Sequence, residues 1–276
     1  MRAGLSPAVT GSLVRSVQVC DPRSLKRHDS RRGDFVGLIE GSTILTINRR
    51  GKFLWLSLDT GDAVVIHLGM SGQVLLRDPD AEDEKHLRVR LTIEMSDARV
   101  VEVRFVDQRI FGSMAVDHMV AGIGGPVPSQ TAHISPDPLE DVFDDDAFVA
   151  KLRRRHTGIK RALLDQTLIS GIGNIYADES LWRARIHYDR PSHELSARKV
   201  RELLGHVRDV LGQALVEGGT SFDAQYVNVN GQAGYFEHSL NVYGRQGEQC
   251  PRCGGTVVRE SFMNRGSHFC PRCQLR

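Results

Sequence analysis

No part of this sequence is apolar over a long distance. No stretch among its 276 residues approaches the roughly 20 apolar residues of a membrane-spanning helix, and the N-terminus has no apolar signal core. Internal repeats and low-complexity segments are also missing. These absences argue against an integral membrane protein and against a secreted one. We therefore expect a cytoplasmic protein with no membrane partner.

The chain also has little net charge. Its 36 Lys and Arg against 34 Asp and Glu leave +2, and 40% hydrophobic with 25% charged residues is the composition of an ordinary globular protein. The charge is unevenly distributed, however. Residues 137–146 carry six acidic side chains, whereas residues 245–276 carry six arginines against two glutamates. Local basic regions, rather than the total, favour a polyanionic partner.

Cysteine is scarce, and four of the five cysteines form one pattern near the end of the chain. Two Cys-x2-Cys pairs sixteen residues apart have the ligand count and spacing of a zinc ribbon: Cys250, Cys253, Cys270 and Cys273. Disulfides are the alternative, which the expected reducing compartment disfavours. Four thiolates close the metal's coordination shell, so we predict one structural zinc that holds a hairpin at residues 256–269. Arg259 and Arg265 on that hairpin favour phosphate binding, although a zinc ribbon can equally bind protein.

Short alternating apolar patterns predict β-strands in the first hundred residues, and these strands predict a β-sandwich or barrel. The predicted strands are 12–19, 43–48, 53–58, 63–68, 73–76, 87–94 and 100–105. A Gly- and Pro-rich linker is expected at 117–139. Helical periodicity then predicts helices at 145–156, 159–165, 175–184 and 196–216.

The segment from Ile159 to Glu179 is a candidate anion site. Its two helical patterns are separated by a turn that contains Gly171 and Gly173, and Asn174 is a candidate N-cap of the second helix. Free amides and the positive end of the helix dipole favour a phosphate there. A tight corner without a ligand is the alternative. The basic residues just before the turn favour the anion site: Lys151, Arg153, Arg154, Arg155, Lys160 and Arg161.

Two other loops have unusual compositions. The turn Gly69-Met70-Ser71-Gly72 places a methionine at a loop tip, and because methionine is usually buried, an exposed one needs a reason. Residues 220–234 are rich in Gly and Asn, which is typical either of a surface connection or of a mobile cover over a ligand.

Taken together, these motifs resemble bacterial formamidopyrimidine-DNA glycosylase, a helix-two-turns-helix family. The resemblance spans residue 2 to the C-terminus. The motifs on which it rests are Arg49-Arg50-Gly51-Lys52, His67-Leu68-Gly69-Met70-Ser71-Gly72, Asp107-Gln108-Arg109-Ile110-Phe111-Gly112, 159–179, Gly218-Gly219-Thr220, Gly234-Tyr235-Phe236, Tyr243-Gly244-Arg245 and 264–274.

The resemblance implies an α+β multidomain protein with an N-terminal β-sandwich, a C-terminal helix-two-turns-helix domain and a zinc ribbon. The expected boundaries are 1–116 for the sandwich, 117–139 for the linker, 140–240 for the helical domain with a lesion-capping loop, and 241–276 for the zinc-finger hairpin. It also implies a monomeric base-excision repair enzyme at the bacterial nucleoid. Such an enzyme removes oxidised purines (8-oxoguanine and formamidopyrimidine) from double-stranded DNA and nicks abasic sites by β,δ-elimination.

Residue roles are implied in the same way. Asn174 and Arg265 resemble the pair that grips phosphates beside the flipped nucleotide, with Gly171 and Gly173 in the adjoining turn. Lys52 resembles a lysine that contacts backbone phosphate and assists catalysis. The side chains that resemble those filling the space left by the extruded base are Met70, Arg109 and Phe111.

One departure concerns catalysis. Members of the family begin Met-Pro-Glu-Leu-Pro-Glu, and the exposed proline amine attacks the sugar, whereas this sequence begins Met1-Arg2-Ala3-Gly4-Leu5. We expect that the start codon lies further upstream. The alternative is a natural truncation, which would make the protein a catalytically deficient binder of lesions or abasic sites. A zinc-ribbon protein of the transcription or translation machinery is a third interpretation, which the 170–174 turn and the Met70 loop do not favour.

Overall fold

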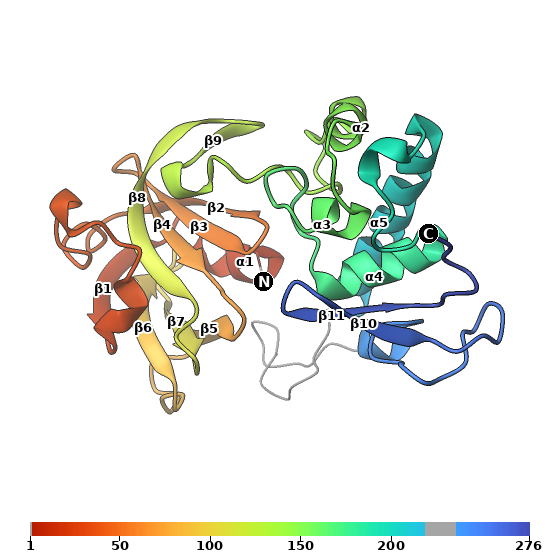
Figure 1. Cartoon of the computed structure of the whole chain (residues 1–276). Helices are drawn as coiled ribbons and strands as arrows, with labels where there is room; N and C mark the ends of the chain where they lie inside the picture. The colour runs from red at the N-terminus through yellow and green to blue at the C-terminus, as the bar shows by residue number, and fades with distance from the viewer. Residues whose placement is uncertain (1, 219–235) are drawn as a thin grey trace. The chain divides into compact units, whose positions relative to one another are not determined.

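The computed structural model describes residues 2–218 and 236–276 and divides the chain into two compact units (Figure 1). Among these residues the first unit extends to His133, and the second contains Ile134 to Gly218 and Phe236 to Arg276. The expected capping loop at 220–234 lies outside the described residues, and the expected boundary between 240 and 241 stays a prediction. Among the residues that the structure describes, no helix combines the length and apolarity needed to cross a bilayer.

The first unit contains a short helix and two antiparallel sheets. One sheet has the strand order β1-β6-β7-β5 and the other β2-β3-β4-β8-β9. The elements are α1 (Arg2–Val9), β1 (Leu13–Val19), β2 (Ile44–Arg50), β3 (Phe53–Leu58), β4 (Asp62–His67), β5 (Gly72–Arg77), β6 (Leu87–Glu94), β7 (Val100–Asp107), β8 (Ser113–Gly122) and β9 (Gly125–Pro128), with short 3-10 turns η1 (Pro22–Leu25), η2 (Ser30–Arg32) and η3 (Ser129–Thr131).

Both sheets contribute to one apolar core, which makes this unit a β-sandwich. β6 alternates buried and half-buried residues along its whole length, as a strand with one covered face should. Val89, Leu91 and Ile93 of this strand pack with Leu54 and Ile66 of the other sheet. Helix α1 adds further apolar side chains to the same core. The predicted sandwich is therefore confirmed.

The prediction of a linker at 117–139 is wrong for its first part, which forms two paired strands. β8 continues to Gly122, and β9 pairs with it, for example Val120 with Val127, so residues 117–128 belong to the sheet. The glycines and prolines that suggested a linker lie in this edge hairpin. Gly124 takes a positive φ of 83° in its turn, and an edge strand tolerates Pro126 and Pro128 because its outer side needs no ladder hydrogen bonds.

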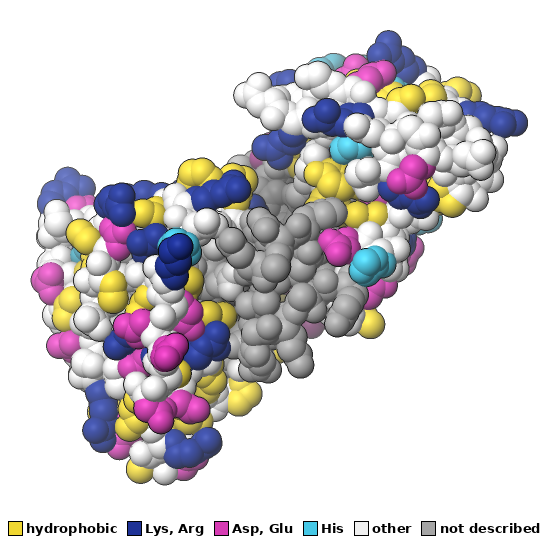
Figure 2. All heavy atoms as spheres, turned by 90° about the horizontal axis from the view of Figure 1, so that it is seen from below, with side chains coloured by type: hydrophobic (Ala, Val, Ile, Leu, Met, Phe, Trp, Pro, Cys, Tyr) yellow, Lys and Arg dark blue, Asp and Glu magenta, His cyan; other side chains and the backbone are white. Residues whose placement is uncertain are grey.

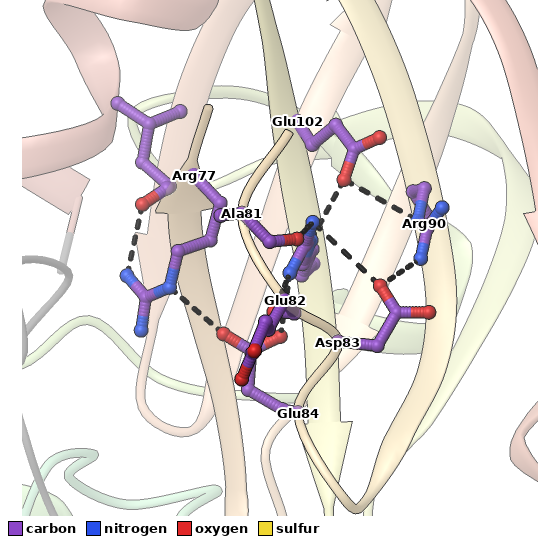
Figure 3. A network of polar contacts seen from close by, with 9 residues as sticks. Arg77, Ala81, Glu82, Asp83, Glu84, Arg90 and Glu102 are labelled. Atoms are coloured by element: carbon purple, nitrogen blue, oxygen red, sulfur yellow. Dashed lines mark hydrogen bonds and ion pairs between the residues drawn. The ribbon is translucent and has the colours of Figure 1, made fainter. Parts of the chain in front are cut away.

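A buried arginine fixes the connection between β5 and β6. Arg104 of β7 has a fully buried side chain that pairs with Glu102 at 2.7 Å and Glu84 at 3.1 Å. It also donates to the main-chain oxygens of Ala81 and Glu82. In Figure 3 the acidic side chains of this segment converge on the arginines of the sheet, including Arg77 and Arg90. A buried guanidinium is tolerated because its donors are satisfied in this way.

The second unit contains helices and a hairpin. The elements are α2 (Asp145–Arg153), α3 (Ile159–Leu163), α4 (Asn174–Arg183), α5 (Ala197–Val216), β10 (Val258–Phe262) and β11 (Arg265–Phe269), with 3-10 turns η4 (Ser192–Glu194) and η5 (Phe236–Ser239). Helix α5 buries a stripe at helical spacing that includes Val200, Leu204, Val207 and Leu211, and Ser196 caps its N-terminus by accepting from the Lys199 amide. A core formed by all four helices also takes in Phe269 of β11.

Candidate nucleic-acid interface and metal centre

The four cysteines of the C-terminal pattern meet in space. One sulfur from each lies within 4.8 Å of all the others, around the base of the β10–β11 hairpin. The Cys250–Cys273 sulfurs are 3.9 Å apart and the Cys253–Cys270 sulfurs are 3.6 Å apart. Four ligands at about 2.3 Å from a tetrahedral zinc stand about 3.8 Å from one another, whereas a disulfide needs about 2.05 Å. The donor set therefore fits one zinc ion.

Helix α4 supports this centre. The Trp182 indole donates to the Cys250 sulfur at 3.4 Å, and the Arg252 guanidinium lies 4.0 Å over the Trp182 ring. Burial raises the pKa of the Cys250 thiol, but the hydrogen bonds from Trp182 and from nearby amides bring it to about 6. Burial and the neighbouring sulfurs raise the pKa of Cys273 to about 12. At neutral pH the thiolate form of Cys273 therefore needs a cation beside its sulfur.

The predicted anion turn lies directly beside the hairpin. Helix α4 begins at Asn174, whose side-chain amide donates to the Gly266 oxygen at 3.0 Å. The exposed Arg265 directly precedes Gly266 in β11, so the structure brings Asn174 and Arg265 into the same region. Asn174 does not cap the helix as expected, because Gly173 holds the N-cap position without a side-chain bond. Gly171 takes a φ of 84° and its α-carbon faces Asp137, where an added Cβ would lie 3.3 Å from that side chain.

The basic run before this turn is not one solvated patch. Lys160 is fully buried; its ammonium pairs with Asp178 at 2.7 Å and donates to the Ser267 hydroxyl at 2.7 Å. Arg155 pairs with Asp165. The expectation that Lys160 contributes to an anion site is therefore wrong, because the fold uses its charge in a buried ion pair, whereas the half-buried Arg155 is paired at the surface. Residues of the run that remain exposed are Lys151, Arg153, Arg154 and Arg161.

Glu179 is a structural residue that the sequence did not indicate. Its carboxylate is almost fully buried in α4 and accepts from the amides of Asn241, Val242 and Tyr243 at 2.8 to 3.0 Å. Asp178 beside it accepts from the His268 amide at 2.9 Å. Two consecutive acids of one helix thus hold the chain before and inside the hairpin. An acidic pair within an apolar helix pattern is the only sequence signal for this role.

The first unit places the other predicted residues on neighbouring loops. Met70 is 54% exposed between β4 and β5, and Phe111 is 46% exposed between β7 and β8, beside the exposed Arg109. The two loops touch at glycines: a Cβ on Gly69 would lie 2.7 Å from the Gly112 nitrogen. Lys52, in the β2–β3 turn, donates to the Gly69 oxygen at 3.2 Å. Lys52 and the three residues Met70, Arg109 and Phe111 therefore share one region of this unit.

The surface charge of the first unit is mixed on the face shown in Figure 2, where its Lys and Arg side chains (left) are interspersed with Asp and Glu.

Three family models match the chain. They are "Formamidopyrimidine-DNA glycosylase N-terminal domain" over residues 1–114, "Formamidopyrimidine-DNA glycosylase H2TH domain" over 134–225, and "Zinc finger found in FPG and IleRS" over 247–276. A formamidopyrimidine-DNA glycosylase of Leifsonia xyli subsp. xyli is 62% identical over 99% of this chain and 96% of its own length. One of Nocardioides sp. is 56% identical over 99% and 91%. The chain belongs to the formamidopyrimidine-DNA glycosylase family.

Solved structures agree with this assignment. The chain is similar to Lactococcus lactis Fpg in a complex with abasic-site DNA, with a TM-score of 0.82, 30% identity, and coverage of 100% of this chain and 97% of that one. A second L. lactis complex, with Fapy-dG DNA, gives a TM-score of 0.81 at the same identity and coverage. As a formamidopyrimidine-DNA glycosylase, the protein is a base-excision repair DNA glycosylase, and its cysteine cluster is the site of one structural zinc ion.

Proposed function

We propose that this glycosylase binds double-stranded DNA as a monomer, removes oxidised purines such as 8-oxoguanine and formamidopyrimidine, and cuts the resulting abasic site by β- and δ-elimination at the bacterial nucleoid. The observation that carries this proposal is the exposure of Met70, Arg109 and Phe111 on two loops that pack against each other. The L. lactis relatives in complex with Fapy-dG DNA and abasic-site DNA support it.

The three exposed side chains suit a base-flipping enzyme. Extruding a nucleotide costs a few kcal/mol of stacking and pairing, which apolar side chains entering the stack offset. Met70 and Phe111 would fill that space, and Arg109 would face the orphan cytosine. Lys52, whose ammonium reaches the Met70 loop, would contact backbone phosphate and assist catalysis.

The second unit would hold the DNA backbone. Arg265 has an exposed guanidinium, and the residue after it is tied to Asn174 at the start of a ten-residue helix. A helix N-terminus and a nearby arginine together favour phosphate. Gly173 has open space at its α-carbon, which would let a bulky polyanion approach the backbone, and Gly171 with its φ of 84° would give the turn its shape.

The phosphate role of Arg265 is tested by Arg265→Ala, with Lys199→Ala as the control, because Lys199 is already paired with Glu202 at 2.7 Å. Affinity for a duplex with an abasic-site analogue is measured over a range of salt concentrations. Arg265→Ala should weaken binding and lower the slope of log K against log salt by about one, and the control should leave both unchanged. An unchanged slope for Arg265→Ala would rule out the phosphate contact.

The lyase step requires an amine nucleophile, which the resemblance assigns to an N-terminal proline. Two proteins are compared: the 276-residue chain and a version that begins Pro-Glu-Leu-Pro-Glu. Each is incubated with 8-oxoguanine duplex, without borohydride to measure base release and cutting, and in parallel with borohydride, which reduces the Schiff base between the amine and the sugar carbon to a stable adduct. We expect base release, strand cutting and a trapped adduct from the extended version. Base release without cutting or adduct would refute the lyase proposal.

A further inference from the structure

The loop that carries Arg109 and Phe111 has a strained backbone. Ile110 lies between these two residues with a φ of 55°, in the left-handed region that a β-branched side chain rarely adopts. Such a conformation costs on the order of 1–3 kcal/mol and persists only where its surroundings impose it. Lys26 imposes part of it, because its ammonium donates to the Ile110 oxygen at 2.5 Å.

The carboxylate of Asp107 imposes the rest. It has no solvent exposure and accepts hydrogen bonds from the amides of Arg109 at 3.2 Å and Gly112 at 2.7 Å, so it clamps both ends of the strained segment. The same carboxylate accepts from the Ser71 hydroxyl, which belongs to the other loop, one residue after Met70. One buried side chain therefore links the loops that carry all three exposed residues.

Asp107 is itself held firmly. The main-chain amide of Asp107 donates to the main-chain oxygen of His86 at 3.0 Å, and its main-chain oxygen accepts from the Arg88 guanidinium at 2.8 Å. Arg88 pairs in turn with Asp21 at 3.0 Å. The segment that ends in His86 is anchored by the Arg104 network shown in Figure 3. Asp107 is thus held by Arg88 of β6 and by His86 of the anchored β5–β6 connection.

The geometry points to Asp107 and Ser71 as positioning residues: through the Ser71–Asp107 hydrogen bond, the Met70 loop and the Arg109–Phe111 loop enter the DNA as one rigid wedge. This inference rests on the proposed wedge role of Met70, Arg109 and Phe111. The physical gain is preorganisation, because side chains that are ordered before binding lose less conformational entropy when they enter the base stack.

Ser71→Ala tests the link, because it removes the bond between the loops and leaves Asp107 its two amide donors. Ser129→Ala is the matched control: Ser129 also donates to a buried aspartate, Asp117, at 2.8 Å. Asp117 lies opposite Ala63 in the β4–β8 strand pair. The Met70 and Arg109–Phe111 loops meet at the other end of β4, beside His67, so the control is remote from them. Full-length proteins are mixed with duplex that carries 2-aminopurine beside 8-oxoguanine, and stopped-flow fluorescence reports base extrusion.

We expect Ser71→Ala to slow extrusion about tenfold, which corresponds to about 1.4 kcal/mol for a hydrogen bond to a charged group. Initial DNA affinity should change less than threefold, Ser129→Ala should extrude at the wild-type rate, and Ser71→Thr, which keeps the hydroxyl, should restore extrusion. Extrusion by Ser71→Ala at the wild-type rate would overturn the inference, and so would an equal loss in Ser129→Ala.

A double-mutant cycle separates this inference from the proposed function. If Ser71 acts through Met70, the double variant Met70→Ala/Ser71→Ala should extrude no more slowly than Met70→Ala alone. Full additivity of the two losses would overturn the coupling while leaving the wedge intact. Wild-type extrusion by both Met70→Ala and Phe111→Ala would instead refute the wedge role in the proposed function, and the coupling with it.

Discussion

His67 shows how strongly single residues in the first unit depend on their neighbours. It is the last residue of β4, and its ring lies 4.6 Å from the ring of Phe53. Burial lowers the pKa of His67 to about 4, and the positive charges of Arg27, Lys52 and Lys26 act in the same direction. The imidazole is therefore neutral at pH 7, near three positively charged side chains.

Acid should therefore destabilise the protein through His67. The unfolded imidazole titrates near pH 6.5 and the folded one has a pKa of about 4, so the unfolded state binds more protons between these values and stability falls as pH falls through this window. After a discount for partial exposure, the loss between pH 7 and pH 5 is about 1 kcal/mol. Urea unfolding at both pH values should show that His67→Gln loses less stability than the wild type. Equal losses would contradict this prediction.

At the scale of elements, helix α4 organises the second unit. Its first residue binds β11, Asp178 binds both Lys160 and β11, and Trp182 contacts the metal centre. Glu179 holds the segment that precedes the hairpin. One helix thus follows the predicted anion turn at its start and supports the zinc site near its end.

Glu179→Ala should destabilise the second unit by about 3 kcal/mol, because three amides, that of Val242 buried and the other two half-buried, lose a charged acceptor. Glu202→Ala is the control, since its exposed pair with Lys199 contributes less than about 1 kcal/mol. Chemical unfolding followed by Trp182 fluorescence, with Trp55 of the first unit replaced by Phe in every variant, measures both. Hydrogen exchange should also show faster exchange at residues 241–243 in Glu179→Ala. Equal stability of the two variants would show that the contacts of Glu179 are dispensable.

For the whole molecule, each unit has its own apolar core, and within residues 2–218 and 236–276 the metal-binding cysteines all belong to the second. Chelating zinc should therefore lower the melting transition of the second unit and leave that of the first in place. Differential scanning calorimetry measures this. Leu54→Ala and Leu204→Ala, each costing about 2–5 kcal/mol in one core, assign the two transitions. A chelator that shifted both transitions equally would contradict independent units.

Much of the fold was predictable because its signals are local. Short runs rich in Val, Ile, Leu and Thr, several of them alternating, predicted seven strands within a few residues of their observed bounds, and the cysteine spacing predicted the zinc site. The predictions failed where the structure of a segment depends on residues that are distant in the sequence. The β8–β9 hairpin resembled a linker because an edge strand accepts Gly and Pro. Lys160 resembled a surface cation because its partner Asp178 lies eighteen residues further along the chain.

The sequence by itself determined the family, the two kinds of architecture, the zinc ligands and the exposed positions of Met70 and Arg265, because each of these follows from spacing, periodicity or a shared motif. Only the tertiary structure decided which charges are used internally and how the loops are held. In the sequence Asp107 is only one acidic residue at the end of a strand. Its role in linking the two loops depends on Ser71 and Gly112, which the fold brings within hydrogen-bond distance.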